Sequence, residues 1–213
     1  MHELFQEIRS VIISGRPKEV EAPIQRAIEA GVPLDRLIHE AMIDAMDEVG
    51  RRFTAQEIFV PEMLASAMAM KKGLSLIKPL LTASQNVSRG TVLICTVKGD
   101  IHDIGKNLVV MMLEGAGFQV MDLGVDVTVE ALVEKVRESR PQILGLSALL
   151  TTTMPEMKRV IETLEAEGLR DQVKVIVGGA PVDEAFALRI GADGYGADAA
   201  QAVALCKKLV EVA

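Results

Sequence analysis

Aromatic residues are scarce in this sequence, which has no tryptophan, one tyrosine and five phenylalanines among 213 residues. Proteins that bind single-stranded nucleic acid stack bases on aromatic side chains, and DNA-binding domains present a basic surface. The chain carries a formal net charge of −7 and has few rings to stack on. Its composition therefore argues against a nucleic-acid-binding protein.

Long apolar runs are also missing, and no stretch reaches the length of a membrane span. The first residues alternate charged and apolar side chains, unlike a signal peptide. The two cysteines, Cys95 and Cys206, stand in apolar surroundings, and neither has a Cys or His neighbour at metal-ligand spacing. We expect buried, reduced thiols and a cytoplasmic location.

Residues 1–85 show helical periodicity only, with apolar side chains at spacings of three and four. We expect Gly50 to end the third helix and Phe53 to lie in the loop that follows. Short connections favour a small antiparallel bundle. Its four helices are expected over residues 4–12, 20–30, 34–49 and 61–80.

The pattern changes after a polar segment, 82–90, which is the best candidate for a linker. We therefore predict two domains, 1–85 and 86–213. From Thr91 onward, short apolar strands alternate with amphipathic helices, which predicts a parallel sheet with helices on both faces. Five such units fit an α/β, flavodoxin-like (Rossmann-like) sheet with strand order 2-1-3-4-5. The strands are expected at 91–97, 118–123, 142–148, 173–179 and 192–196.

Ligands bind such sheets outside the carboxyl ends of the strands. The predicted strand ends carry the unusual residues of this chain, because the segment 99–105 (GDIHDIG) follows the first strand and Ser147 ends the third. Gly178-Gly179 ends the fourth strand, and Tyr195-Gly196 ends the fifth. These clusters should share one edge of the sheet. For the glycine pair, a tight turn from strand to helix is the alternative explanation.

His102 is one of three histidines in the chain and the only one in this cluster. Gly99 and Gly105 flank it, which suits the close approach of something bulky. Asp100 lies within reach of the imidazole, and a carboxylate that accepts from Nδ1–H would leave Nε2 free for a metal. One histidine is too few for a metal site built by protein alone. It suffices if a macrocycle supplies the remaining ligands.

The stretch Asp100-x-His102-x-x-Gly105 resembles the cobalamin-binding motif Asp-x-His-x-x-Gly. The matching family continues with Ser-x-Leu and Gly-Gly, and this chain has Ser147-Ala148-Leu149 after 41 residues and Gly178-Gly179 after 28 more. The run 59–62, together with Gly50, Phe53 and Glu57, resembles the helical cap of methionine synthase and of small corrinoid proteins. Segment 147–154 is similar to corrinoid proteins of methanol, methylamine and methoxy-aromatic methyltransferase systems.

This resemblance implies a cobalamin or related corrinoid whose cobalt takes His102 as its lower ligand, in place of the benzimidazole tail. The tail would enter a slot between the sheet and its helices. There Ser147 would hydrogen-bond it, Leu149 would pack on it, Gly178 and Gly179 would let it pass, and Tyr195 and Gly196 would line the far end. The full set of expected cofactor-binding residues is Gly99, Asp100, Ile101, His102, Asp103, Ile104, Gly105, Ser147, Leu149, Thr151, Gly178, Gly179, Tyr195 and Gly196.

The resemblance also implies a relay of His102, Asp100 and Thr153 that answers the changing demand of cobalt for a lower ligand. Methionine synthase has a serine where this chain has Thr153, which keeps the hydroxyl. The protein would be a non-catalytic or co-catalytic subunit that carries methyl groups. Its partners would be a substrate-specific methyltransferase, an acceptor methyltransferase and a reductive activation protein. The bundle would cap the cofactor, hinged near 82–90, with Leu64, Met68 and Met70 facing the corrin or, equally, filling the bundle core.

Other functions of this fold fit less well. A receiver domain needs an aspartate where Ser147 ends the third strand, and a flavodoxin needs a Ser/Thr-rich loop after the first. A cobalamin-sensing regulator or a cobalamin storage protein stays open as the alternative function, although no basic recognition helix precedes the sheet. For Asp103 and Lys106, a solvated position in the first turn of a helix is as well supported as a role at the cofactor.

Overall fold

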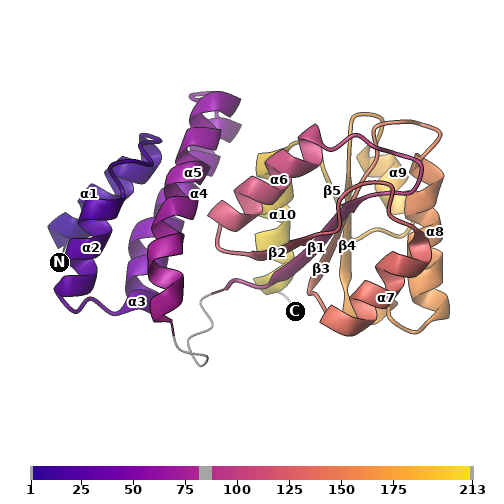
Figure 1. Cartoon of the computed structure of the whole chain (residues 1–213). Helices are drawn as coiled ribbons and strands as arrows, with labels where there is room; N and C mark the ends of the chain where they lie inside the picture. Colours follow the sequence, from indigo (N-terminus) through magenta and orange to yellow (C-terminus); the bar gives the residue numbers. More distant parts are fainter. Residues whose placement is uncertain (1, 82–87, 212–213) are drawn as a thin grey trace. The chain divides into compact units, whose positions relative to one another are not determined.

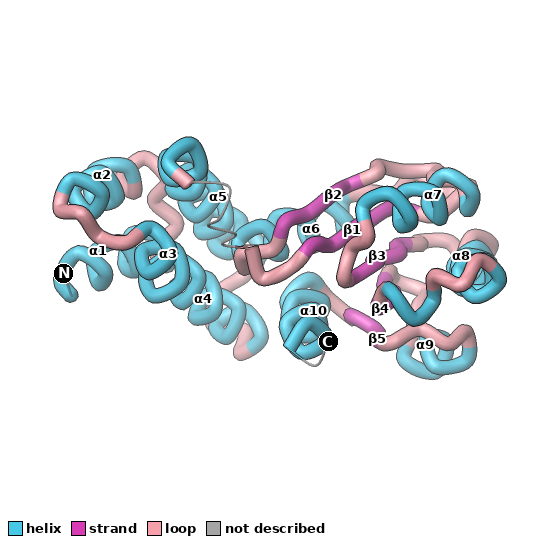
Figure 2. The backbone as a smooth tube through the Cα atoms, turned by 90° about the horizontal axis from the view of Figure 1, so that it is seen from below, coloured by secondary structure: helices cyan, strands magenta, loops and turns pink. Residues whose placement is uncertain are grey.

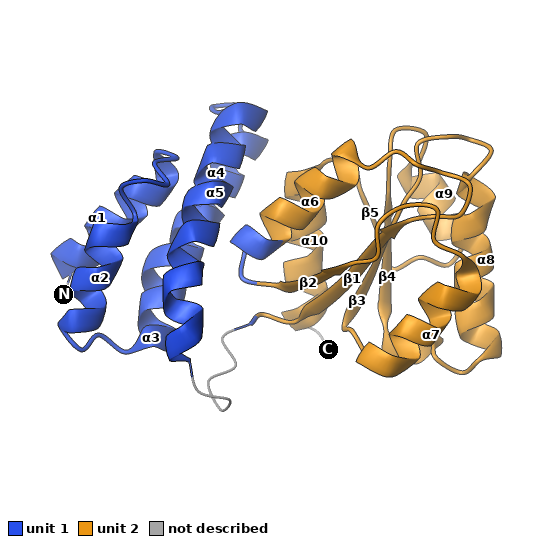
Figure 3. Cartoon of the chain, in the orientation of Figure 1, with its two compact units in different colours: residues 1–88, 114–117 blue, residues 89–113, 118–213 orange. Residues whose placement is uncertain are grey.

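The computed structural model describes residues 2–81 and 88–211, which divide into two compact units (Figure 3). Unit 1 comprises Met1–Ser88 with Glu114–Gly117, and unit 2 comprises Arg89–Leu113 and Phe118–Ala213. Residues 82–87, which hold the predicted domain boundary and most of the predicted hinge, lie outside the described residues.

Unit 1 owes its helices to apolar stripes at helical spacing. In α1 (His2–Ile13) the stripe consists of Phe5, Ile8, Val11 and Ile12, all buried. None of the helices in the described residues is long and apolar enough to span a membrane. The other helices are α2 (Glu21–Glu29), α3 (Leu34–Arg36), α4 (Asp44–Thr54) and α5 (Val60–Ile77); a π-helical segment (Leu37–Ile43) joins α3 to α4, and a 3₁₀ turn (Lys78–Leu80) follows α5.

The third predicted helix is longer than its sequence suggested. We expected it to end at Gly50 with Phe53 in a loop, but α4 continues to Thr54 and includes both residues. A glycine inside a helix costs only about 1 kcal/mol, which tertiary packing outweighs. The helix ends instead where Gln56 adopts a φ of +60°, and the Gln56 N–H donates to the Phe53 carbonyl.

Unit 2 alternates strands and helices as predicted. The five strands form one parallel sheet in the order β2-β1-β3-β4-β5, which confirms the flavodoxin-like topology. In chain order the elements are β1 (Thr91–Thr96), α6 (Ile104–Gly115), β2 (Gln119–Asp122), α7 (Val129–Ser139), β3 (Ile143–Ser147), α8 (Met154–Ala166), a 3₁₀ turn (Arg170–Gln172), β4 (Lys174–Gly178), α9 (Glu184–Arg189), β5 (Gly194–Gly196) and α10 (Ala199–Glu211).

Side-chain caps set the start of three of these helices, because an N-terminal turn leaves backbone N–H groups without partners inside the helix. Thr128 accepts from the N–H of Ala131 at the start of α7. Asp183 accepts from the N–H of Phe186 at 2.7 Å, and Asp198 accepts from the N–H of Gln201 at 2.8 Å. These caps fix where α7, α9 and α10 leave the loops at the carboxyl edge of the sheet.

Helices α7, α8 and α9 cover one face of the sheet, and α6 and α10 cover the other (Figures 1 and 2). Because successive strand residues point to opposite faces, alternate positions divide between the two layers. The face toward α7–α9 is the main hydrophobic core of unit 2. Its strand residues include Leu93, Cys95, Leu144, Leu146, Val175 and Val177, all 2% exposed or less.

Candidate functional site

His102 lies in the loop between β1 and α6, at the carboxyl edge of the sheet. Its side chain is 46% exposed, and its Nδ1 lies 2.7 Å from Oδ1 of Asp100. Among the described residues, none hydrogen-bonds the other ring nitrogen, Nε2. The imidazole is therefore held on one side and open to a ligand on the other.

Asp100 is completely buried and accepts five hydrogen bonds. Oδ1 takes the ring and the backbone N–H (3.1 Å) of His102, and Oδ2 takes the N–H groups of Leu149 (2.8 Å) and Leu150 (3.3 Å) and the Thr153 hydroxyl (2.7 Å). Burial alone would raise the pKa of Asp100. These bonds, led by that from Leu149, outweigh burial and hold the pKa well below its ordinary value.

An ionised carboxylate can only accept hydrogen bonds, so the short contact to Asp100 requires a proton on Nδ1 of His102. The neutral ring then has its lone pair on Nε2, the form that binds metals. The two residues thus form the pair that the sequence predicted. The charge on Asp100 fixes the His102 tautomer, and the backbone N–H groups of His102, Leu149 and Leu150 stabilise that charge.

Thr153 completes the predicted trio. It is 6% exposed, and its hydroxyl oxygen lies 2.7 Å from Oδ2 of Asp100 and 2.9 Å from the carbonyl of Leu150. A hydroxyl has one proton, and the charged carboxylate is the stronger of the two acceptors. The structure brings Asp100, His102 and Thr153 together from two loops that lie about 50 residues apart in the sequence.

Exposed aliphatic side chains surround the strand ends near His102. Ile101 is 73% exposed and Ile104 81%, while Leu149 is 43% exposed. Such exposure of large apolar residues in one region is typical of a binding surface. Two further members, Val125 after β2 and Leu150 after β3, were missed from the sequence, although both follow strands whose carboxyl ends meet at this edge.

A row of small residues crosses the carboxyl end of the sheet on the face toward α6 and α10. The strand register pairs Thr96 with Ser147, Ser147 with Gly178, and Gly178 with Gly196. Among the described residues, the Ser147 hydroxyl has no hydrogen-bond partner. Three of the predicted cofactor residues are therefore neighbours, and the row presents a hydroxyl without a partner in the described chain. The two glycines are closely packed, because a Cβ at Gly178 would lie 3.0 Å from the Gly196 carbonyl oxygen and a Cβ at Gly196 would lie 2.9 Å from the Ala202 Cβ.

Two predicted residues do not join this row. Tyr195 packs against the core cluster under α7–α9, because strand alternation turns its side chain away from Gly196. Thr151 is exposed in the loop after β3. Conversely, Thr96 was missed: it is fully buried, and its hydroxyl donates to the His102 carbonyl at 2.9 Å. Its position at the end of β1 could have indicated it.

The glycines of the motif serve different purposes. A Cβ at Gly105 would have no atom within 4 Å, so the protein itself does not require glycine there. Gly99 has a φ of +79°, and Gly179 has a φ of +128° and would place a Cβ 1.9 Å from the Ala148 carbonyl oxygen. Gly179 is therefore needed by the turn after β4, as the alternative explanation proposed, whereas Gly105 leaves room for a ligand.

Lys106 is 2% exposed, which excludes the solvated position, one of the two alternatives considered for it. Its ammonium group pairs with Asp122 at the end of β2 and donates to Asn107 at 2.9 Å. A neighbouring strand thus supplies the counter-charge that makes burial tolerable. Asp103 is half-buried and accepts from the Asn107 side chain at 3.0 Å.

The cysteines are free and buried, and burial raises the pKa of both thiols to about 12. They are protonated at neutral pH and unsuited to bind metal. In the described part of the chain, no group of three or more His, Cys, Asp or Glu side chains could hold a metal ion. If His102 held a metal ion, the ion would need further ligands from outside this set of side chains.

The three residues of unit 1 that we considered for the upper face of the corrin differ in accessibility. Met68 is 58% exposed and Leu64 is half-buried, whereas Met70 is completely buried. Met70 therefore fills the core, and only Met68 and Leu64 remain accessible to a ligand. Phe59, at the start of α5, is 65% exposed and was not among them.

Residues 90–204 match the family described as B12 binding domain, and residues 4–78 match a second family with the same description. The chain is 43% identical over 212 residues to the trimethylamine corrinoid protein of Methanosarcina barkeri, which covers 99% of this chain and 98% of that protein. It is 42% identical over 209 residues to the dimethylamine corrinoid protein of the same organism, covering 98% of each.

Among solved structures, the chain is similar to the methanol:cobalamin methyltransferase complex MtaBC from Methanosarcina barkeri. The TM-score is 0.89 at 34% identity, and the match covers 99% of this chain and 81% of that one. The open imidazole of His102, the exposed aliphatic side chains and the row of small residues suit a cobalamin-type ligand, as named for the MtaBC complex. The chain therefore belongs to the family of B12-binding corrinoid proteins, and its cofactor is a corrinoid.

Proposed function

We propose that this protein is the corrinoid methyl carrier of a methyltransferase system, with His102 as the lower ligand of cobalt. When bound, the corrinoid supplies a cobalt centre that accepts a methyl group and gives it up again. The observation that carries the proposal is the geometry of His102. Its Nδ1 is fixed by a buried carboxylate, while Nε2 is open at an edge lined by exposed aliphatic side chains.

In this proposal the protein presents Nε2 of His102 to the cobalt and controls the proton on Nδ1. Asp100 holds a proton on Nδ1 of His102 and so keeps the lone pair on Nε2. If Nε2 had no ligand, the ring could hold a second proton there, and the Asp100 carboxylate would lie next to the resulting positive charge. The Thr153 hydroxyl lies 2.7 Å from the other carboxylate oxygen of Asp100. Its hydrogen bond to Asp100 could strengthen or weaken as the charge on the His102 ring changes.

The row on the sheet is the proposed seat of the lower-base tail. The Ser147 hydroxyl would donate to it, and the tail would pass over the backbone of Gly178 and Gly196 once the Ala202 side chain, which lies 2.9 Å from the Cβ position of Gly196, has moved. Ile101, Ile104 and Leu149 would cover the apolar underside and edge of the ring. Removing such side chains from water contributes about 25 cal/mol per Å² of apolar surface, against which the entropic costs of binding are set.

The partners that this function needs are a methyltransferase that loads the cofactor, one that unloads it, and a protein that restores the reduced cobalt. Relatives named for trimethylamine and dimethylamine favour a methylated amine as the methyl donor. The buried, reduced thiols suit the cytoplasm.

The test is electron paramagnetic resonance of the cobalt(II) form, with the full chain loaded with hydroxocobalamin and reduced. Protein labelled with nitrogen-15 histidine should split the cobalt signal as doublets, because nitrogen-15 has spin one-half. Unlabelled protein should give triplets. Triplets in the labelled protein would show that the benzimidazole or another nitrogen is the ligand, and the assignment of His102 would be wrong.

Variants then assign the relay. His102→Ala should lose the labelled coupling, whereas His39→Ala, at an exposed histidine of unit 1, should keep it. Asp100→Asn should weaken corrinoid binding about 10–100-fold, the usual cost of losing a partner of a metal ligand. Thr153→Ser should behave as wild type, and Thr153→Val should not. A loaded protein that neither accepts nor donates methyl groups with any methylamine methyltransferase would favour storage or sensing instead.

A further inference from the structure

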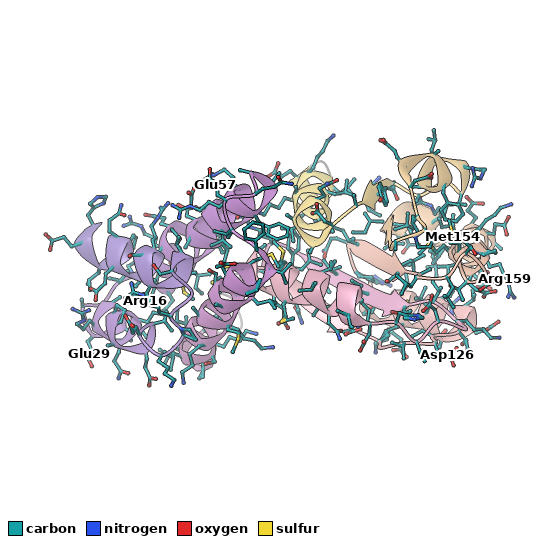
Figure 4. All side chains as sticks on the ribbon, turned by 90° about the horizontal axis from the view of Figure 1, so that it is seen from above. Arg16, Glu29, Glu57, Asp126, Met154 and Arg159 are labelled. Atoms are coloured by element: carbon teal, nitrogen blue, oxygen red, sulfur yellow. The ribbon has the colours of Figure 1, made fainter. Side chains whose placement is uncertain are left out.

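The loop after β2 holds the loop that carries His102. Asp126 lies in the loop after β2 and is labelled in Figure 4. Its Oδ1 accepts the N–H of Gly99 at 2.7 Å. Its own N–H donates to the Asp100 carbonyl at 3.0 Å. One residue thus engages the backbone on both sides of the Gly99–Asp100 peptide, immediately before the carboxylate that orients His102.

The strands beneath this contact place the two loops side by side. The N–H of Thr96 donates to the Gly124 carbonyl, and the N–H of Val127 donates to the Thr96 carbonyl. Val97 and Val127 form a parallel bridge beyond the named strands. The β2 loop is therefore an extension of the sheet alongside β1, and Asp126 lies where this extension reaches the His102 loop.

The backbone of Asp126 is unusual as well. Its φ is +53°, in the left-handed region that costs most residues about 1–2 kcal/mol but that aspartate and asparagine enter readily. Gly99, its partner, has a φ of +79°. The side chain of Asp126 is exposed, so burial does not explain its conformation. What the conformation achieves is to aim both its N–H and its carboxylate at the His102 loop.

We propose that Asp126 is a positioning residue, which acts through Gly99 and Asp100 to hold the carboxylate where it can fix the His102 tautomer. Asp100 cannot orient the imidazole unless its own backbone is fixed, because its side chain must meet donors from two loops at once. The part of this inference that concerns cobalt rests on the proposed function. The part that concerns the His102 ring does not, since it is a property of the protein without cofactor.

Three substitutions at Asp126 separate the hydrogen bond from the backbone conformation. Asp126→Asn keeps an acceptor and tolerates the positive φ, so it should behave as wild type. Asp126→Gly keeps the conformation but loses the acceptor. Asp126→Ala loses both. Arg140→Ala is the matched control, because Arg140 also has a positive φ (+44°) but caps α7 and donates its N–H to Val136.

The first readout is the tautomer of His102 in the cofactor-free chain, from two-bond proton–nitrogen correlation spectra of the ring recorded at alkaline pH, where imidazoles are neutral and a tautomer is defined. With three histidines in the sequence, His102→Ala assigns the signal. Wild type, Asp126→Asn and Arg140→Ala should show the Nδ1-protonated ring. Asp126→Gly and Asp126→Ala should show a mixture of tautomers. An unmixed Nδ1-protonated ring in Asp126→Gly would overturn the inference.

The second readout is the dissociation constant for hydroxocobalamin, from absorbance titrations. Asp126→Gly should raise it about tenfold, the lower end of the range for outer partners of a metal ligand, and Asp126→Asn should leave it unchanged. If only Asp126→Ala weakens binding, backbone strain and not the hydrogen bond is responsible, and the inference is wrong. Asp126→Gly could mix the tautomers while wild-type holoprotein labelled with nitrogen-15 histidine shows no coupling to cobalt. In that case the positioning role of Asp126 would be supported, and the assignment of His102 as the cobalt ligand would be wrong.

Discussion

The two faces of the sheet in unit 2 are built from alternate residues of the same strands, yet they diverge toward the strand ends. On β3, Leu146 faces α7–α9 and is 2% exposed in the core. The next residue, Ser147, faces the other layer and has neighbours Thr96 and Gly178 in register. One face stays apolar to its end, while the other gives way to hydroxyls and bare backbone.

This difference separates stability from function along one element. The face toward α7–α9 contributes burial of large side chains, the main favourable term in folding. The face toward α6 and α10 gives up such burial where the row of small residues begins. The buried core therefore lies directly behind the row that we propose for the lower-base tail, and its packing holds the residues of that row in place.

The largest predicted effect lies at Gly179, which follows the proposed ligand-binding row and is required by the turn after β4. Gly179→Ala should destabilise the protein by more than about 4 kcal/mol, because the new Cβ would lie 1.9 Å from the backbone oxygen of Ala148 at a φ of +128°. Urea unfolding followed by circular dichroism measures it. Gly191→Ala is the control: its φ is +78°, but the nearest atom is 3.9 Å away, so about 1–2 kcal/mol is expected. Equal losses would mean that the clash is relieved by a shift of the turn.

Leu146→Ala and Ser147→Ala test the two faces at adjacent positions. Leu146→Ala should cost about 3 kcal/mol, within the range for buried leucines, through lost transfer energy and a cavity. Ser147→Ala should change stability by less than about 0.5 kcal/mol but raise the dissociation constant for hydroxocobalamin by up to about tenfold. Denaturation and absorbance titration of each variant give the two numbers. If both variants lost stability alike, the division between the faces would be mistaken.

The fold was predictable because its signals are local. Buried strands ended by glycine and helices opened by Thr128, Asp183 or Asp198 are visible in the sequence, and alternation of the two fixes a parallel sheet. Gly50 misled the prediction, since a propensity of about 1 kcal/mol is smaller than the packing that carries α4 through it.

The candidate site was predictable only in part. Asp100 and His102 are two residues apart and carry a motif, so both stand out in the sequence. The backbone donors to Asp100 come from Leu149 and Leu150, about 50 residues further on, and no residue type marks them as donors. Asp126 was missed and the position of Lys106 was left open for the same reason: their roles depend on which strand ends become neighbours in three dimensions.

Lys106 offers a smaller test on the face toward α6 and α10. Lys106→Met keeps most of the aliphatic stem but leaves Asp122 without its ammonium partner, so we expect a loss of about 1–3 kcal/mol in the free energy of unfolding. Lys135→Met, which breaks an exposed pair with Glu138, is the control and should leave the urea midpoint unchanged. A midpoint for Lys106→Met as high as that of the control would mean that the buried pair contributes nothing net.

Gly105→Ala should have the smallest effect on stability. It separates stability from binding most clearly, because it should strengthen the folded state and weaken corrinoid binding. Gly105 lies in the first turn of α6, and a Cβ there would meet nothing within 4 Å. Gly105→Ala should therefore stabilise the cofactor-free protein by up to about 1 kcal/mol, since alanine restricts the unfolded chain and favours helix. The same methyl group would occupy space that the corrin ring needs, so the dissociation constant for hydroxocobalamin should rise. Denaturation without cofactor and titration with it separate the two. A variant that gains stability and binds as tightly as wild type would show that the open space beside His102 is not where the ring lies.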